Sequence, residues 1–195
     1  MTQPTRRVVT GHDDQGKAVV LIDGPAPNVK VRAASGLIST LLWVSDETPA
    51  DVSGHADQAE RTIGVAPPSN GSILRVVDFP PATAGAAEVD HAQLLREMGL
   101  PEEPARPRHT FTHRTRSLDY AIVLTGEIDM LLDDSQVHLK AGDVLVQQGT
   151  NHAWVNNGTQ TCRIAFVLID AQEPPAWKRR VEASTQHKVK RLSTE

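Results

Sequence analysis

Short apolar runs rich in β-branched residues recur along the chain, and clusters of Gly, Pro, Asp and Asn separate them. In the first half the runs cover residues 17–22, 37–44 and 72–79. The first run is followed by Asp-Gly-Pro, and the third by Pro-Pro. Brief apolar runs that end at such turn-forming residues are typical of strands. The pattern therefore predicts three strands before residue 80.

One segment shows a helical period instead. Its apolar residues recur about every 3.6 positions, and they are Val89, Leu94, Leu95 and Met98. Asp90 stands where an N-terminal cap would accept backbone N–H groups, and Gly99 stands where a left-handed residue would end the helix. The sequence therefore predicts one short helix.

The densest β pattern lies between residues 110 and 170. Apolar and polar positions alternate there, and turns such as Thr-Gly-Glu, Asp-Asp-Ser and Ala-Gly-Asp separate the runs. The predicted strands cover residues 120–124, 128–132, 137–139, 144–146 and 164–169. Many short strands joined by tight turns indicate an all-β sandwich or closed barrel, and helix formers are too sparse for βαβ units. Residues 46–70, rich in Pro, Asp, Ser and Gly, are expected to form a loop that wraps over the barrel or covers its mouth.

Length, charge and cysteine content narrow the class of protein. The 195 residues suffice for a single domain with its own core. A net charge of −4 and a pI near 6.1 argue against nucleic acid as a partner. Cys162 is the only cysteine, so no disulfide forms within the chain. No apolar run reaches the ~18 residues of a membrane span, and no signal core follows the polar start, so we expect a cytoplasmic location and no membrane partner.

Two stretches carry the candidate chemistry. The first begins His-Arg-Thr-Arg-Ser-Leu-Asp-Tyr at His113 and closes at Gly126, and the second runs from Gly142 through His152 to Asn156. Together they resemble the two consecutive motifs of the cupin superfamily. By this resemblance His113, Asp119 and His152 occupy the positions of the family's metal ligands: the first histidine, the glutamate and the later histidine.

The sequence departs from the family pattern at two ligand positions. Thr115 stands where the second histidine of the first motif belongs, and Asp119 replaces a glutamate. The second motif also lacks its usual Pro. The His-Arg-Thr-x-Ser-x-Asp-Tyr segment further resembles a bacterial and fungal cupin subgroup.

The resemblance implies a jelly-roll β-barrel with one short helix and a division of the chain into three parts. Residues 1–104 would be an N-terminal β extension packing on the barrel, residues 105–172 the barrel core, and residues 173–195 a basic C-terminal tail. The tail is expected to be solvated, with a contact to an anion or a partner as the alternative. The resemblance also implies a homodimer.

Residue spacing leads to the same candidate site. His113, Thr115 and Asp119 are two and four residues apart, so they share one face of a strand, and His152 arrives from a later strand. Two imidazoles and a carboxylate suit a divalent transition metal such as Fe, Mn, Zn or Ni, with open positions for a substrate. The alternative, favoured by Thr115, is a metal-free pocket with a hydrogen-bonded histidine pair.

Four further residues are candidates for the surroundings of this site. Thr115 could orient a ligand or a water through its hydroxyl, and Gln147 could face inward as a polar pocket group. Trp154 either packs the barrel or stacks on a substrate. His109 either replaces the missing histidine ligand or lies at the surface.

Arg75 lies within the predicted strand 72–79. It could bind a substrate carboxylate through its fork of donors, or it could form an ion pair with Asp78 or Glu88.

The leading function is a metal-dependent enzyme acting on a small organic molecule. By resemblance, the reaction would be dioxygenation, decarboxylation, isomerisation or a lyase reaction, and no catalytic acid or base is identifiable beyond the ligands. The alternative is a non-catalytic cupin that binds or senses a small molecule with a degenerate metal site.

Overall fold

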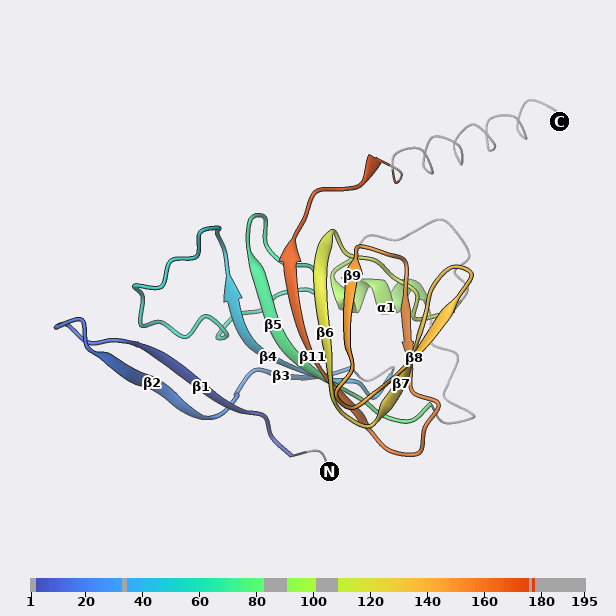
Figure 1. Ribbon diagram of the computed structural model, residues 1–195, viewed down its shortest axis with the longest axis horizontal. Coiled ribbons are helices and arrows are strands. Elements are labelled where there is room, and N and C mark those ends of the chain that lie inside the picture. The colour runs from blue at the N-terminus through green and yellow to red at the C-terminus, as the bar shows by residue number, and fades with distance from the viewer. Residues whose placement is uncertain (1–2, 33–34, 83–90, 101–108, 176, 178–195) are drawn as a thin grey trace.

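A computed structural model describes residues 3–32, 35–82, 91–100, 109–175 and 177 (Figure 1). It contains, in chain order, β1 (Arg6–His12), β2 (Ala18–Pro25), β3 (Val29–Val31), β4 (Ile38–Ser45), β5 (Ser72–Phe79), α1 (His91–Met98), β6 (Ser117–Thr125), β7 (Glu127–Leu131), β8 (Gln136–Lys140), β9 (Val144–Gln148), β10 (Ala153–Val155) and β11 (Cys162–Asp170). The predicted all-β class is confirmed, and α1 is the predicted short helix; it is the one helix that the described ranges contain as a full element.

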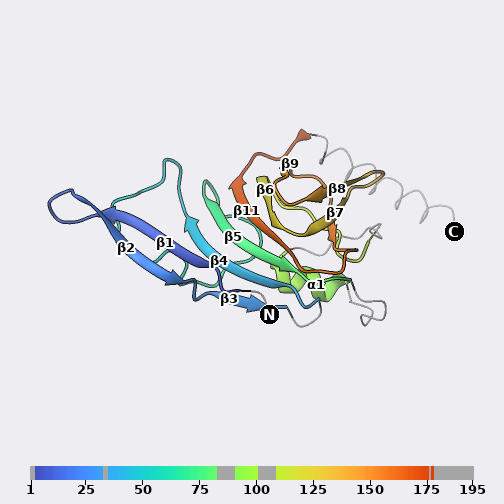
Figure 2. The same cartoon turned by 60° about the horizontal axis from the view of Figure 1, so that its bottom comes forward.

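The barrel consists of a curved six-stranded sheet and a smaller sheet facing it (Figure 2). The large sheet has the order β3-β4-β5-β11-β6-β9, and the small sheet has the order β10-β7-β8. Strand β11 pairs antiparallel with both β5 and β6, so it joins the early and late parts of the chain. This arrangement is a jelly-roll barrel. Its large sheet includes three strands from the part of the chain before residue 105: β3, β4 and β5.

The core fills the space between the two sheets. Along β11, Ile164, Phe166 and Leu168 are buried and alternate with residues that are only partly covered. Ile128 on β7 and Trp154 on β10 belong to the same cluster of buried side chains. Because successive side chains of a strand point to opposite faces, this alternation places every second residue inside the barrel.

Helix α1 and the segment 46–70 lie beside one another. Leu94, Leu95 and Met98 of α1 are buried, and the Val65 N–H donates to the Met98 carbonyl at 2.9 Å. The helix ends as predicted, with Gly99 at a φ of 69°. The predicted positions of Val89 and Asp90 lie outside the described residues.

The pattern of hydrophobic residues did not predict β1, β3 or β10. Strand β1 pairs with β2 to form a hairpin that projects from the barrel (Figure 1), and its outer residues are too polar to mark it as a strand. Strand β10 is only 3 residues long. No helix in the described ranges is long and apolar enough to cross a membrane.

Candidate functional site

His113 and His152 form the centre of the candidate site. Each donates its backbone N–H to the carbonyl of the other, at 2.9 and 3.0 Å. This isolated antiparallel bridge holds the two residues opposite one another, with their ring centroids 4.4 Å apart. Both rings line an internal cavity.

The hydrogen bonds of the two rings determine their tautomers. The Nδ1 atom of His113 lies 2.9 Å from the Phe111 carbonyl oxygen, and the Nδ1 atom of His152 lies 3.0 Å from the Thr150 carbonyl oxygen. A carbonyl oxygen only accepts, so each Nδ1 carries the proton and each neutral ring keeps its lone pair on Nε2.

Burial keeps both imidazoles neutral. It lowers the pKa of His113 to about 4, and the pKa of His152 to about 3. The His113 ring lowers the pKa of His152 further, because two adjacent positive charges would repel one another. At neutral pH the site therefore presents two uncharged imidazoles with free Nε2 lone pairs.

Asp119, the third predicted ligand, is held by a chain of hydrogen bonds. The Ser117 hydroxyl donates to its Oδ1 at 2.5 Å, and the Gln147 amide donates to its Oδ2 at 2.9 Å. Thr115 Oγ1 lies 2.7 Å from Ser117 Oγ. Because Ser117 uses its proton on the carboxylate, Thr115 is the donor of that bond. Burial raises the pKa of Asp119 to about 6.

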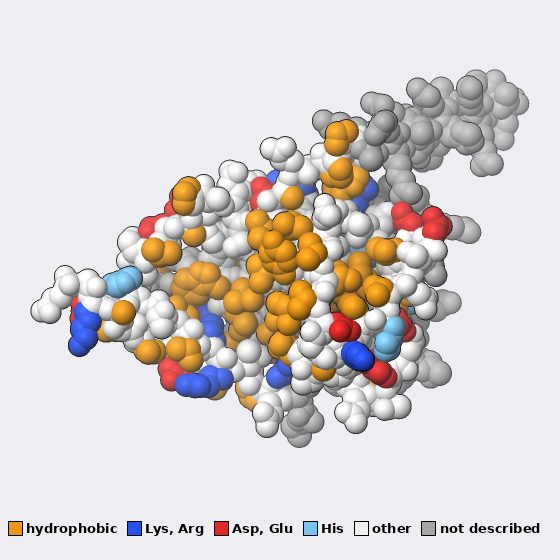
Figure 3. Space-filling view, in the orientation of Figure 1, with side chains coloured by type: hydrophobic (Ala, Val, Ile, Leu, Met, Phe, Trp, Pro, Cys, Tyr) orange, Lys and Arg blue, Asp and Glu red, His pale blue; other side chains and the backbone are white. Residues whose placement is uncertain are grey.

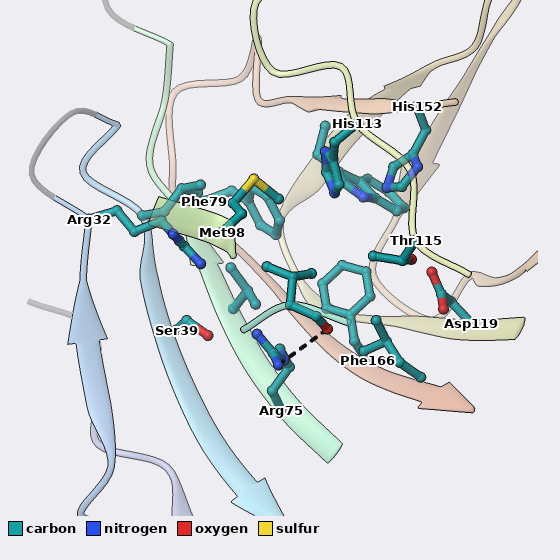
Figure 4. Close-up of a pocket in the computed structure, with 15 residues that line it drawn as sticks. Arg32, Ser39, Arg75, Phe79, Met98, His113, Thr115, Asp119, His152 and Phe166 are labelled. Atoms are coloured by element: carbon teal, nitrogen blue, oxygen red, sulfur yellow. Dashed lines mark hydrogen bonds between the residues drawn. The ribbon is translucent and has the colours of Figure 1, made fainter. Parts of the chain in front are cut away.

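The structure brings two of the three predicted ligands together. Thr115 lies between the histidines and Asp119 in the cavity (Figure 4). In the ranges that the structure describes, no three His, Cys, Asp or Glu side chains gather as a potential ligand set. The imidazole pair fits a transition metal, because each ring directs a lone pair away from its carbonyl partner. Within the described ranges the Asp119 carboxylate does not join the pair as a third ligand, and its two oxygens accept hydrogen bonds from Ser117 and Gln147.

Aromatic side chains form an apolar wall of the cavity. The Trp154 ring packs edge-on against Phe166, with centroids 5.5 Å apart, and against His152 at 6.0 Å. Phe79 completes the wall at 6.2 Å from Trp154. Trp154 is thus both a core residue and a lining residue, and the two roles expected for it are compatible.

The remaining predicted candidates take different places. Gln147 is buried, and it faces inward to hold Asp119. His109 accepts the Phe111 N–H on its Nδ1 at 3.2 Å, and it does not belong to the cavity lining. The ion pair with Asp78, one of the alternatives for Arg75, is wrong, because Asp78 accepts two hydrogen bonds from Arg163 instead. Glu88 lies outside the described residues.

Two residues that line the cavity beside Arg75 were not among the predicted candidates: Arg32 and Ser39. Arg75 is buried, and it donates to the Gly64 carbonyl at 2.8 Å. Arg32 follows a strand of 3 residues that has no buried side chain, so no pattern in the sequence marks it as internal. Ser39, by contrast, lies between Leu37 and Leu41 on the same face of the predicted strand 37–44. A polar residue on an otherwise apolar face is a signal that could have identified it.

A jelly-roll barrel whose inner cavity is lined by a pair of facing histidines defines the class of protein. Residues 97–169 match the cupin domain family. The chain is 30% identical over 173 residues to the cupin-domain-containing oxidoreductase fogC of Aspergillus ruber. The aligned region covers 86% of this chain and 73% of that protein. The chain belongs to the cupin superfamily.

Other relatives are similar over the same span. The cupin-domain-containing oxidoreductase srdD of Neurospora crassa is 30% identical over 174 residues, covering 86% of this chain and 76% of its own length. The phomopsin biosynthesis cluster protein D of Diaporthe leptostromiformis is also 30% identical, covering 85% of this chain and 78% of its own length. Among solved structures, the Cnp3 cupin domain of Schizosaccharomyces pombe aligns with a TM-score of 0.43 and 16% identity, covering 90% of this chain and 93% of that one.

Proposed function

We propose that this protein is an enzyme that acts on a small organic molecule in the cavity beside His113 and His152. The single observation that carries the proposal is the pair of neutral imidazoles with free Nε2 lone pairs. Two relatives that are 30% identical are named oxidoreductases, and another is named for a biosynthesis cluster. These names favour an oxidoreductase of small-molecule biosynthesis.

The enzyme is expected to depend on a divalent transition metal, with Fe, Mn, Zn and Ni as candidates. His113 and His152 would hold the ion through Nε2, because their Nδ1 protons are fixed on carbonyl oxygens. Such a metal supplies Lewis acidity toward a substrate oxygen, or a redox centre if it is iron. The ring orientation does not depend on the ion, since backbone atoms set it.

The protein's own residues shape the rest of the site. Thr115 directs its proton to Ser117, so the lone pairs of its hydroxyl oxygen are free to accept a hydrogen bond from a ligand. Trp154 and Phe166 exclude water from one wall of the cavity, which strengthens polar interactions inside it. A small molecule with an apolar part and a polar end fits these surroundings.

A metal-free binding protein is the second candidate. The observation that favours it is the occupation of both Asp119 oxygens by Ser117 and Gln147. Thr115 stands in the position of a histidine, and among the described residues no third His, Cys, Asp or Glu gathers with the histidine pair. A small molecule would then be bound without a metal, by hydrogen bonds and by packing against the aromatic wall.

Metal analysis separates the two candidates. Protein purified without chelator, and then incubated with Fe(II), Mn(II), Zn(II) or Ni(II), is expected to retain one ion per chain by elemental analysis. His113→Ala and His152→Ala should each lose the ion and keep the far-ultraviolet circular dichroism spectrum of a folded barrel.

Asp119→Asn is the matched control, because it keeps the size and shape of the side chain and removes its charge. In the structure the Asp119 carboxylate accepts hydrogen bonds from Ser117 and Gln147 and is not grouped with the histidines, so the variant is expected to retain the metal. The enzyme proposal fails if the natural chain takes up none of these metals, and the histidine pair is not the site if both alanine variants keep a stoichiometric ion.

A further inference from the structure

Two arginines lie at the end of the cavity away from the histidines. Arg32, just after β3, and Arg75 on β5 flank Ser39 of β4, and the three are separated from the imidazoles by Phe79, Met98 and Phe166 (Figure 4). The cavity therefore has a cationic end, an apolar middle and an end with two neutral imidazoles.

Both guanidinium groups are buried and incompletely bonded. Arg32 and Arg75 are each 7% exposed. Arg32 Nη1 and Arg75 Nε have no hydrogen-bond partner within the described part of the chain. A buried charged donor without a partner is costly, and proteins normally pair such groups. Each of these two nitrogen atoms can therefore donate a hydrogen bond to an acceptor on a bound ligand.

The two positive charges also disfavour one another. Burial lowers the pKa of Arg75 to about 10, and the charge of Arg32 lowers it further, against an opposing effect of Asp119. Burial likewise lowers the pKa of Arg32, against an opposing effect of Glu97. An anion placed between the guanidinium groups would relieve both the repulsion and the missing hydrogen bonds.

The same residues border a second cavity that extends outward. The inner cavity has a volume of about 90 Å³ and the outer one about 320 Å³, and Arg32, Ser39 and Arg75 line both. Lys30 adds a further cation to the outer lining, which includes no Asp or Glu among the described residues, whereas Arg61 lines the same cavity but pairs with Asp46 at 2.7 Å. In a chain of net charge −4, this concentration of cations marks a site for an anionic ligand.

We infer that Arg32, Ser39 and Arg75 form an anion-binding subsite that holds the carboxylate or phosphate of a small ligand. The apolar part of this ligand extends past Phe79 and Phe166 toward the histidine pair. The inference deepens the proposed function, and it rests on that function only in treating the inner cavity as the substrate site. It restricts the substrate class to organic anions with an apolar body.

Calorimetric titration with small probes tests this subsite without any need for turnover. The probes are 3-phenylpropionate, its uncharged amide and phenyl phosphate, each titrated into the metal-free full-length protein. At least one anionic probe is expected to bind about tenfold or more tightly than the amide, since hydrogen bonds to charged groups are strong. The stronger anion shows whether a carboxylate or a phosphate is preferred.

Variants at the subsite identify the residues responsible. Arg32→Gln is expected to weaken binding of the anion about tenfold or more, and to bring it close to that of the amide. Arg75→Lys keeps the charge in the core but loses the fork of donors, so an intermediate loss is expected. Arg61→Gln is the matched control, because Arg61 lines the outer cavity but already pairs with Asp46 at 2.7 Å. It should change the affinity by less than about twofold.

The inference is overturned if neither anion binds more tightly than the amide, or if Arg61→Gln weakens binding as much as Arg32→Gln does. The latter result would mean that the positive charges around the outer cavity attract the anion non-specifically, and that Arg32, Ser39 and Arg75 do not form a specific binding site. Failure of the proposed function looks different. In that case the natural chain takes up no metal, while the arginine-dependent binding of the anion persists.

Discussion

Backbone carbonyls, not carboxylates, orient the two histidines of the site. The sequence indicated His113 and His152 as a pair through the resemblance to the two cupin motifs, and the structure joins them in an isolated β-bridge just outside β6 and β10. It did not indicate that Asp119 is bonded to Ser117 and Gln147. Ser117 follows Thr115 by two residues and precedes Asp119 by two, so the alternation that selected Asp119 also places Ser117 on the same face. The role of Gln147 depends on the pairing of β6 with β9, which the sequence does not fix.

The burial of the two imidazoles predicts how stability depends on pH. Their pKa values in the folded protein, about 4 for His113 and about 3 for His152, lie below the ordinary value of 6.5. The unfolded chain therefore binds more protons, and the free energy of unfolding falls as pH falls from about 6.5 toward 4. Asp119 acts in the opposite direction between pH 3.8 and about 6, because burial raises its pKa. Two histidines outweigh this one carboxyl group.

Urea unfolding of the chelator-treated protein at pH 7 and pH 5 measures this effect. His152→Gln should lose less stability on acidification than the natural chain, by up to about 1.4 kcal/mol per pH unit. His138→Gln is the control: this ring is exposed, and its pKa is raised by the hydrogen bond with Asp129. It should not reduce the loss. Equal acid sensitivity of His152→Gln and the natural chain would contradict the assignment of a buried neutral imidazole.

At the level of elements, the turns were more predictable than the strand pairings. Gly and Asp clusters separated β6, β7, β8 and β9 correctly, because a tight hairpin has to be closed by residues that adopt unusual backbone angles. The sequence also predicted the end of α1, where Gly99 and the next residue donate their N–H groups back to the last helical turn. Strand β1 was not predicted because its alternation of apolar and polar residues is weak. In the structure it pairs with β2 in a separate two-stranded sheet.

Gly126, between β6 and β7, is required for both its conformation and its lack of a side chain. Its φ is +76°, and a Cβ atom there would lie 2.9 Å from both Cys162 Cα and the Thr161 carbonyl oxygen. These are backbone atoms of the neighbouring strand region, so they cannot move aside as a side chain would. Gly142 has a φ of +94° and nothing within 4 Å of the same position. Substitutions at these two glycines therefore distinguish the energetic cost of the left-handed backbone from the cost of steric overlap.

Gly142→Ala is expected to cost about 1 kcal/mol in the free energy of unfolding, from the left-handed conformation alone. Gly126→Ala should cost about 3 kcal/mol or more, because overlap with fixed backbone adds to that strain. Urea denaturation followed by circular dichroism measures both variants. Equal losses would show that the approach to Cys162 can relax.

The whole molecule brings together residues that local patterns cannot connect. The site combines β3–β5 with β6, β9 and β10, and β11 joins these parts by pairing Phe166 with both Arg75 and Ala121. Alternation in the sequence predicts which face a residue occupies, but not which strand lies beside it. Arg75 could therefore be noticed as unusual, whereas its position beside Arg32 and its distance from the histidines required the assembled sheet.

The outer face of the large sheet carries the remaining prediction at this scale. Figure 3 shows hydrophobic side chains gathered over β11, β6 and β9. Leu124, Val144 and Val146 are exposed by 45%, 61% and 56%. Val144 and Val146 lie opposite Ile122 and Tyr120 in the pairing of β9 with β6. A contiguous apolar face of this kind favours association, so we expect the homodimer to form through it.

Sedimentation velocity over a range of protein concentrations tests this interface. The natural chain is expected to sediment as a dimer, and the double variant Val144→Lys with Val146→Lys as a folded monomer, because two buried ammonium groups would remain unpaired in the contact. Val52→Lys is the control, since Val52 is 78% exposed in the segment 46–70 and lies outside the pairing of β9 with β6. The prediction is wrong if the natural chain is monomeric throughout, or if Val52→Lys dissociates the dimer equally well. The second result would place the contact on the side of the barrel that carries the 46–70 segment.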